Sequence, residues 1–345
     1  MSLESFFTRS WYGRCGWTNV FRPLQPLIKK AVHNKRKAFL AHPELSYKAP
    51  VPVIIVGNIS VGGTGKSPMV VALCELLIEH GFRPGIVSRG HGAKMDSPTP
   101  VYPDSLPNEV GDEPVMLARR AACPMVVFPK RDEAVKFLLS TTDANVVVSD
   151  DGMQHYQLNR DLEIAMLDAT RGVGNGHLLP VGPLREPIGR LTEVDFVVSV
   201  SETMTKPLEA LNLPVTLTRL VSTKLISLDG TKSLDCHEAF SGNSNWHIMA
   251  GIGNPERFMA TLERLGLQKK NITHQWFVDH HAFEVADIPA DGAVIMTEKD
   301  AVKCQSLELS NSNVWYLPVS LVLPNSFQQA FIEKFNLVKM DHSHE

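Results

Sequence analysis

The fold is predicted most directly by residues 53–68, which read Val53-Ile-Ile-Val-Gly-Asn-Ile-Ser-Val-Gly-Gly-Thr-Gly-Lys-Ser-Pro68. Its apolar start predicts a buried strand, its glycines a tight loop, and the apolar spacing after Pro68 a helix. Backbone N–H groups of such a loop turn towards phosphate oxygens, Lys66 can reach the β- and γ-phosphates, and the Ser67 hydroxyl can join a Mg²⁺ shell. The stretch therefore predicts a nucleotide-binding loop made of Val61, Gly62, Gly63, Thr64, Gly65, Lys66, Ser67 and Pro68. Ser60 replaces the first glycine of the usual pattern.

The bulk composition is that of an ordinary soluble protein. The chain has 345 residues, 43% apolar and 21% charged, which favours one large domain and a smaller one. The net charge of −3 argues against general nucleic-acid binding. Five scattered cysteines predict neither a disulfide framework nor a metal pair, and no apolar stretch reaches the length of a membrane span. No signal peptide and no obligate protein partner are evident.

Residues 1–50 differ from the rest of the chain. They carry nine Lys or Arg against two Glu, a local charge of +7, so the remainder carries −10. Aromatic residues are interleaved with these cations, a pattern that suits an interface with anionic lipid headgroups. An N-terminal arm packed on the main domain, with its charges in solvent, explains the composition equally well.

Strand and helix patterns alternate after residue 50. The predicted strands are 53–57, 84–88, 125–128, 145–149, 162–167 and 196–200, and the clearest helices are 68–80, 113–122 and 131–140. This alternation predicts an α/β fold with a mostly parallel sheet covered by helices on both faces. In such sheets ligands bind beyond the carboxyl ends of the strands.

A second, smaller α/β unit follows a two-stranded connector within 214–230. Strands are expected at 246–251, 271–277 and 293–297, and helices at 255–265 and 326–336. The expected division is an N-terminal segment 1–50, a phosphate-loop domain 51–222, a connector 223–242 and a smaller C-terminal domain 243–345.

Two carboxylates end the predicted strand 145–149. Asp150 and Asp151 stand where a magnesium-binding acid faces a phosphate loop, although a lone Asp there is often only a turn former. Which of the two faces the ion is open. Gly111-Asp-Glu-Pro114 opens a helix, where acids commonly complement the helix dipole. Asp112 and Glu113 are nevertheless candidates for the base that accepts a hydroxyl proton, and Glu113 also for the metal site.

Polar residues after other strands are candidates for substrate binding. Arg89 and Arg131 follow the second and third strands, where each is equally explained as part of a surface turn. The Gly/Pro-rich loop 174–187 is long for a compact domain, and such loops are often functional. Its polar residues Asn175, His177 and Arg185 could contact a substrate with sugar, phosphate and apolar parts. The alternative interpretation is that the loop is an irregularly packed segment without a role in binding.

Two further motifs lie in the second unit. Asp279-His280-His281 has metal-ligand chemistry without a third ligand at a suitable spacing, so a histidine that tunes a carboxylate across the domains is the better interpretation. Thr297-Glu-Lys-Asp-Ala-Val-Lys303 either joins the two units through its charges or begins a helix with Thr297 as N-cap.

Together these motifs resemble the tetraacyldisaccharide 4′-kinase family of lipid A synthesis. The resemblance runs in order through Val61–Pro68, Ser88–Gly90, Gly111–Pro114, Asp150–His155, Gly176–Pro187, Phe277–Phe283 and Thr297–Asp300. Ser60 is usual in the family. Met153 stands where Phe is usual and Val278 where Pro is frequent, both apolar changes that leave the chemistry intact.

The resemblance implies a P-loop kinase with ATP and Mg²⁺ as cofactors. It implies transfer of the γ-phosphoryl to the 4′-hydroxyl of an acylated glucosamine disaccharide 1-phosphate, giving lipid IVA, at the cytoplasmic face of the bacterial inner membrane through residues 1–40. Asp112 is then the base, with His280 beside it and His281 as the fallback. A histidine cation would favour the ionised carboxylate. Without the resemblance, a phosphate-loop ligase or a membrane-recruited ATPase switch would remain open.

Overall fold

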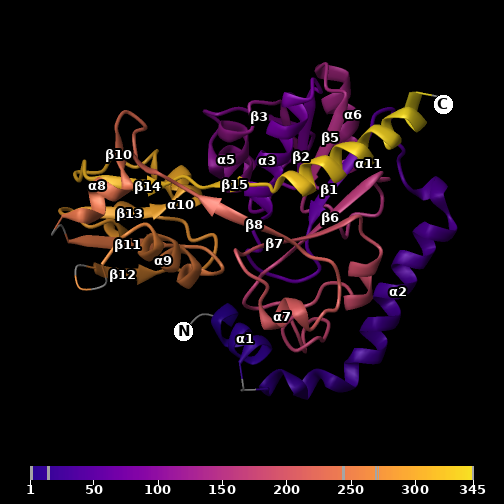
Figure 1. The fold of residues 1–345 in the computed structure, drawn as a ribbon, viewed down its shortest axis with the longest axis horizontal. Helices are drawn as coiled ribbons and strands as arrows, with labels where there is room; N and C mark the ends of the chain where they lie inside the picture. Colours follow the sequence, from indigo (N-terminus) through magenta and orange to yellow (C-terminus); the bar gives the residue numbers. More distant parts are fainter. Residues whose placement is uncertain (1–2, 14–15, 243–244, 269, 271, 344–345) are drawn as a thin grey trace.

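The computed structural model describes residues 3–13, 16–242, 245–268, 270 and 272–343. Two sheets organise these residues into a larger and a smaller domain (Figure 1). The predicted α/β fold with a mostly parallel sheet is confirmed.

The larger sheet has nine strands in the order β15-β8-β7-β6-β1-β5-β2-β4-β3. All neighbours run parallel except β3 with β4 and β15 with β8. The strands are β1 (Val53–Gly57), β2 (Pro84–Ser88), β3 (Thr99–Val101), β4 (Met125–Val127), β5 (Val146–Asp150), β6 (Leu162–Leu167), β7 (Phe196–Val200), β8 (Thr216–Val221) and β15 (Ser320–Val322). The central strands are buried along their whole length because helices cover both faces, which explains their continuous apolar runs.

The two faces of the larger sheet carry different helices. One apolar core joins the sheet to α3 (Lys66–Glu79), α5 (Asp112–Arg120) and α11 (Asn325–Ser343). The other joins it to α6 (Arg131–Thr141), to α7 (Lys206–Glu209) and to part of α2 (Gln25–Ala41). The short α4 (Pro107–Val110) precedes α5, and a 3-10 turn, η3 (Ile188–Thr192), follows the long 174–187 loop.

The smaller domain has a six-stranded sheet in the order β10-β9-β14-β13-β11-β12. Its strands are β9 (Lys224–Ser227), β10 (Ser233–Asp235), β11 (Trp246–Ala250), β12 (Ile272–Trp276), β13 (Ala293–Thr297) and β14 (Val314–Leu317). Its helical segments are α8 (Cys236–Ser241), α9 (Pro255–Arg264), α10 (Glu298–Cys304) and the 3-10 turn η5 (Val285–Asp287). The strands and helix α9 expected here are present within two residues of their predicted bounds.

The C-terminal end of the chain packs with the larger domain, which differs from the expected domain division. After β14 the chain returns to the larger domain, where β15 pairs with β8 and α11 buries Phe327, Phe331 and Phe335 in the larger core. The expectation that 243–345 forms one domain is therefore wrong for residues 320–343. The two crossings between domains are β8 to β9 and β14 to β15, so the connector is a pair of antiparallel strands far apart in sequence (Figure 1).

The N-terminal segment is folded against the larger domain. It forms α1 (Leu3–Tyr12), η1 (Trp17–Leu24), α2 and η2 (Pro43–Leu45), and α2 runs along the outside of the larger domain (Figure 1). The ring of Phe6 stacks on Trp17 with centroids 4.4 Å apart. Four residues of the basic, aromatic segment lie outside the described part of the chain: Met1, Ser2, Arg14 and Cys15. Within that part, no helix is both long and apolar enough to cross a bilayer.

Candidate active site

The phosphate loop joins β1 to α3. The backbone φ angle is +108° at Gly62 and +95° at Gly65, values that residues other than glycine rarely adopt. No side chain caps the start of α3 at Lys66, so its first N–H groups are available to an anion. The Asn58 amide supports the loop from behind, donating to the carbonyl of Gly62 at 3.3 Å and to Thr64 Oγ1 at 3.2 Å.

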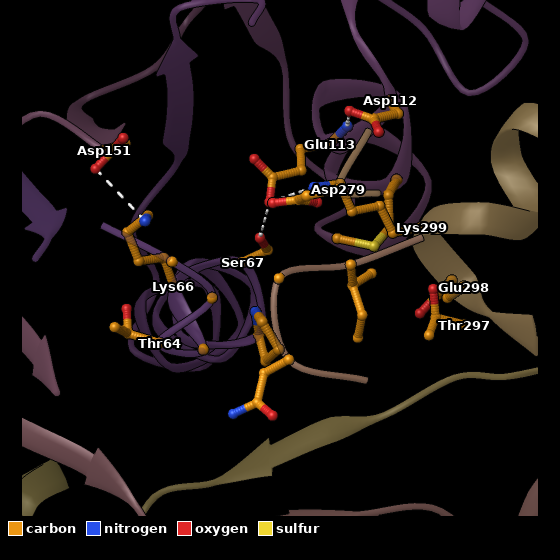
Figure 2. Close-up of a pocket in the computed structure, with 18 of the residues that line it drawn as sticks. Thr64, Lys66, Ser67, Asp112, Glu113, Asp151, Asp279, Thr297, Glu298 and Lys299 are labelled. Carbon is orange, nitrogen blue, oxygen red and sulfur yellow. Dashed lines mark hydrogen bonds and ion pairs between the residues drawn. The ribbon is translucent and has the colours of Figure 1, made fainter. Parts of the chain in front are cut away.

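The tandem carboxylates at the end of β5 have different partners. Asp151 has φ +46°, and its carboxylate receives both Arg185 Nη1 (3.1 Å) and Arg185 Nη2 (2.8 Å). Lys66 Nζ lies 3.6 Å from Asp151 Oδ1 (Figure 2). Burial alone would raise the pKa of Asp151, but Lys66 and Arg185 outweigh it and hold the pKa well below its ordinary value. Asp151 is therefore ionised and charge-balanced.

Asp150 is almost completely buried and lacks such compensation. Ser88 Oγ donates to its Oδ2 at 2.9 Å, while Oδ1 has no hydrogen-bond partner among the described residues. Burial, together with the carboxylates of Glu113 and Asp151, raises the pKa of Asp150 to about 7. Asp150 therefore offers a cation one buried oxygen that accepts no hydrogen bond from the described residues.

Asp112 and Glu113 begin α5 after Gly111, whose φ of +100° turns the chain into the helix. Glu113 Oε1 accepts from Ser67 Oγ at 3.4 Å, which links α5 to the phosphate loop (Figure 2). Asp112 is buried, with 6% of its surface exposed. Burial would raise the pKa of Asp112, but the hydrogen bond from His280 and the charges of Lys299 and Lys303 lower it to about 2.

His280 reaches Asp112 from the smaller domain. Its φ of +58° turns its ring towards α5, where Nδ1 lies 3.2 Å from Asp112 Oδ2. The hydrogen bond with Asp112 raises the pKa of His280 above its ordinary value, against burial and the charge of Lys299. His281 turns elsewhere: its Nε2 lies 3.0 Å from Asp287 Oδ2 and its ring stacks on Phe277. The geometry thus favours His280 over His281 as the partner of Asp112.

One cavity of about 540 Å³ unites these groups at the junction of the two domains. Its polar part is lined by the phosphate loop, Asp112, Glu113, Asp150, Asp151 and His280. Its other part is largely apolar, lined by Leu220, Ile252, Phe258, Leu317 and Val319. Gly253 of the smaller domain lies so close to the loop that an added Cβ would stand 3.5 Å from the Gly63 nitrogen. The site is therefore enclosed by both domains.

The predicted substrate residues lie in three different settings. Arg89 is exposed on the cavity wall, and Arg185 lines the cavity while it holds Asp151. Arg131 is buried behind the carboxylates and donates to the carbonyls of Phe128 and Pro129. Its backbone N–H donates to His155 Nε2.

Asn175 and His177 lie outside the cavity lining, against the N-terminal segment. The Asn175 nitrogen donates to the Trp11 carbonyl at 3.1 Å, and His177 Nε2 lies 3.3 Å from Arg22 Nη2. Gln25 also exchanges hydrogen bonds with the Leu178 backbone. This part of the 174–187 loop is a docking surface for the N-terminal segment, an arrangement that the sequence did not reveal.

Lys299 also lines the cavity, although its sequence pattern did not separate it from its neighbours. Its Nζ lies 3.2 Å from His280 Nε2, 3.4 Å from Asp279 Oδ1 and 3.6 Å from Glu113 Oε1. Lys299 belongs to the charge-rich motif 297–303, which contains four charged residues. The sequence does not show which of these side chains points into the cavity, because that depends on the tertiary fold.

Comparison with known proteins agrees with this geometry. The model of the Tetraacyldisaccharide-1-P 4′-kinase family matches residues 17–336. The chain belongs to this family. The tetraacyldisaccharide 4′-kinase of Pseudoalteromonas atlantica is 45% identical over 91% of this chain and 97% of its own length. That of Nitrosococcus oceani is 42% identical over 97% of this chain and 98% of its own length.

A solved structure of the same kinase family shares the fold. It is the crystal structure of LpxK from Aquifex aeolicus in complex with ATP, 27% identical, with a TM-score of 0.76 over 92% of this chain and 99% of that one. Membership of the kinase family decides against the ligase and the ATPase switch that the phosphate loop alone left open.

Proposed function

We propose that this kinase transfers the γ-phosphoryl of ATP to the 4′-hydroxyl of a tetraacylated glucosamine disaccharide 1-phosphate, giving lipid IVA. The observation that carries the proposal is the meeting of Asp112 and His280, from different domains, inside the cavity that contains the phosphate loop. A phosphate-binding loop beside a hydroxyl-activating carboxylate is the minimum equipment of a kinase.

The phosphate loop is the proposed site for the ATP phosphates. Its backbone N–H groups and the Lys66 ammonium offer positive charge where the phosphates would lie. The ATP in the Aquifex aeolicus structure supports the choice of nucleotide. The apolar part of the cavity offers room for the base away from the carboxylates.

The residues at the site fit a magnesium ion. Asp150 is a buried carboxylate with one unpartnered oxygen, and Glu113 and the Ser67 hydroxyl lie beside it. Oxygen donors of this kind are those that Mg²⁺ prefers. Ser67, Asp150 and Glu113 would hold the ion, and Asp151, held by Lys66 and Arg185, would add negative charge nearby. When bound, the ion would supply positive charge that offsets the negative charge of the phosphates.

Asp112 is the proposed acceptor of the hydroxyl proton. Its low pKa keeps it ionised at neutral pH, and His280 fixes the direction of its carboxylate. In phosphoryl transfer the bond to the leaving group is largely broken before the nucleophile loses its proton, so a weak but well-placed base is sufficient. The proton passes from the sugar hydroxyl to Asp112 as the oxygen–phosphorus bond forms.

The N-terminal segment is the proposed contact with the anionic, cytoplasmic face of the bacterial inner membrane. Val20 (70% exposed), Leu24 (46%) and Leu27 (68%) form an apolar row at helical spacing. The exposed cations Arg22 and Lys30 flank it. Apolar side chains beside cations suit peripheral binding to anionic lipid, where the acylated substrate also resides.

The direct test is product analysis. The purified chain is incubated with Mg·ATP and the tetraacylated disaccharide 1-phosphate, and the lipid is examined by mass spectrometry and ³¹P NMR. The proposal expects one added phosphate, on the 4′-oxygen, and no product with Lys66→Ala. Consumption of ATP with no phosphate on the lipid would refute it.

A further inference from the structure

The helix start Thr297-Glu-Lys-Asp300 has a role that phosphate binding and proton transfer do not explain. Thr297 caps α10, with its Oγ1 accepting from the Asp300 nitrogen at 3.2 Å. Glu298 then pairs with Arg120 at 3.2 Å, on the wall of the cavity. Lys299 points into the cavity itself (Figure 2). The cap therefore fixes the direction of a buried lysine.

The environment of Lys299 keeps it charged. Only 13% of its side chain is exposed. Its Nζ lies 3.4 Å from Asp279 Oδ1 and 3.6 Å from Glu113 Oε1, so two carboxylates pair with the ammonium form. An ammonium group has three donors and no acceptor. Every group that Lys299 contacts must therefore accept a hydrogen bond from it.

This requirement decides the state of the His280 ring. Its Nε2 lies 3.2 Å from the Lys299 ammonium, so Nε2 must present a lone pair. The remaining ring proton is then on Nδ1, which faces Asp112 Oδ2 at 3.2 Å. A ring protonated at both nitrogens would point its Nε2–H donor at the ammonium, which is also a donor, so no hydrogen bond could form. The hydrogen bond with Asp112 raises the pKa of His280 and so favours the imidazolium expected from the sequence, but the Lys299 ammonium at Nε2 opposes that form.

We infer that Lys299 is a positioning residue of the kinase: it holds His280 as the neutral ring with its proton on Nδ1, so that His280 donates to Asp112. The effect of this arrangement on catalysis rests on the proposed function, whereas the state of the His280 ring does not. The second nitrogen of a functional histidine commonly sets the tautomer of the first in this way. Lys299 also touches Glu113 of the larger domain, so the arrangement is complete only when the domains are docked.

Lys303 provides a matched comparison on the same helix. Its Nζ lies 3.9 Å from Asp112 Oδ2 and 2.8 Å from Asp300 Oδ1, and it lies over the ring of Phe283. It thus supplies the same charge near Asp112 without contacting His280 Nε2. If Lys299 acted only through its charge, Lys303→Met and Lys299→Met would have similar effects on His280.

Nitrogen NMR of the histidine rings tests the inference without any catalysis. Protein labelled at histidine with ¹⁵N is examined at about pH 8, and His280 is assigned as the signal lost in His280→Ala. We expect an unprotonated Nε2 in the wild type and in Lys303→Met, and a protonated Nε2 in Lys299→Met. A protonated Nε2 in the wild type, or an unchanged His280 in Lys299→Met, would overturn the inference.

A double-mutant cycle tests the catalytic consequence. Lys299→Met should lower kcat by about 10- to 100-fold with ATP affinity within about threefold, and Lys299→Arg should recover part of the loss. In the His280→Ala background the same change should cost less than about threefold, because no ring remains to orient. Equal losses in both backgrounds would show that Lys299 acts elsewhere. Lys232→Met, at an exposed turn, controls for the loss of a lysine. An inactive wild type would instead count against the proposed function, while the NMR result would stand.

Discussion

The surroundings of Asp112 hold this single carboxylate in its ionised form. It is buried, which opposes ionisation, yet one histidine and two lysines surround it and reverse that effect. The result is a pKa of about 2, below the ordinary value of 3.8. The ionised side chain therefore contributes to the stability of the fold.

The stability contribution has a defined pH dependence. Because the pKa of Asp112 is lower in the folded state, its contribution is complete above about pH 4 and is lost as the pH falls towards 2. Asp112→Asn should lower the free energy of unfolding by roughly 2 kcal/mol at pH 7. Urea unfolding at pH 7 and at pH 3 measures the difference. A deficit that is as large at pH 3 as at pH 7 would mean that the loss does not come from the charge.

The sequence located many of the polar side chains that line the cavity, but not most of their partners. The loop with Lys66, the tandem Asp150 and Asp151, and Asp112 follow strands or open a helix, positions that motif spacing reveals. The family resemblance selected His280 with His281 as the fallback, because two adjacent identical residues carry no other signal that separates them. A local backbone φ of +58° at His280 turns the two rings to different neighbours, and that conformation depends on the tertiary fold.

At the scale of elements, α11 stabilises a domain that its place in the sequence does not suggest. Phe327, Phe331 and Phe335 follow one another at intervals of four, so they lie on one face of the helix. Their rings are stacked, with centroids 5.9 and 6.1 Å apart, and Phe82 and Phe196 of the larger domain pack against them. The pattern predicted a helix, but it could not say which of two cores the helix would join.

Truncation of this helix core should destabilise the larger domain. Phe331 is completely buried, and Phe331→Ala should cost about 3 to 5 kcal/mol of unfolding free energy through lost burial and a cavity. Hydrogen exchange should show faster opening in the large sheet. Leu337→Ala, on the same helix with 65% of its surface exposed, is the matched control and should cost well under 1 kcal/mol. Equal effects of the two changes would contradict this packing.

The 174–187 loop illustrates a second limit of the sequence. Its length and polar tips indicated substrate contacts, yet Trp11 Nε1 donates to the Pro180 carbonyl and Thr18 Oγ1 to the Val181 carbonyl. These partners lie more than 160 residues away in the chain. No local pattern could reveal them. The same loop carries Arg185, which binds Asp151, so this loop contacts both the N-terminal segment and a carboxylate of the cavity.

In the molecule as a whole, the N-terminal segment is the side that we propose contacts a membrane. Val20→Asp combined with Leu27→Asp should weaken binding to vesicles with anionic lipid by at least about tenfold, because charge replaces the exposed apolar row. Vesicle co-sedimentation measures this. Leu337→Asp, which adds a charge at an exposed apolar position of α11, should leave binding unchanged. Full binding by the double variant would move the membrane contact elsewhere.

Two domains join Asp112 and His280 beside the phosphate loop, and we propose that this pair activates the acceptor hydroxyl. Single-turnover transfer from Mg·ATP to the disaccharide lipid, with ATP affinity measured on the same protein, tests this proposal most directly. For Asp112→Asn we expect transfer slowed by about 100-fold or more, with ATP affinity within about threefold of the wild type. Transfer by Asp112→Asn at a rate within threefold of the wild type would contradict it.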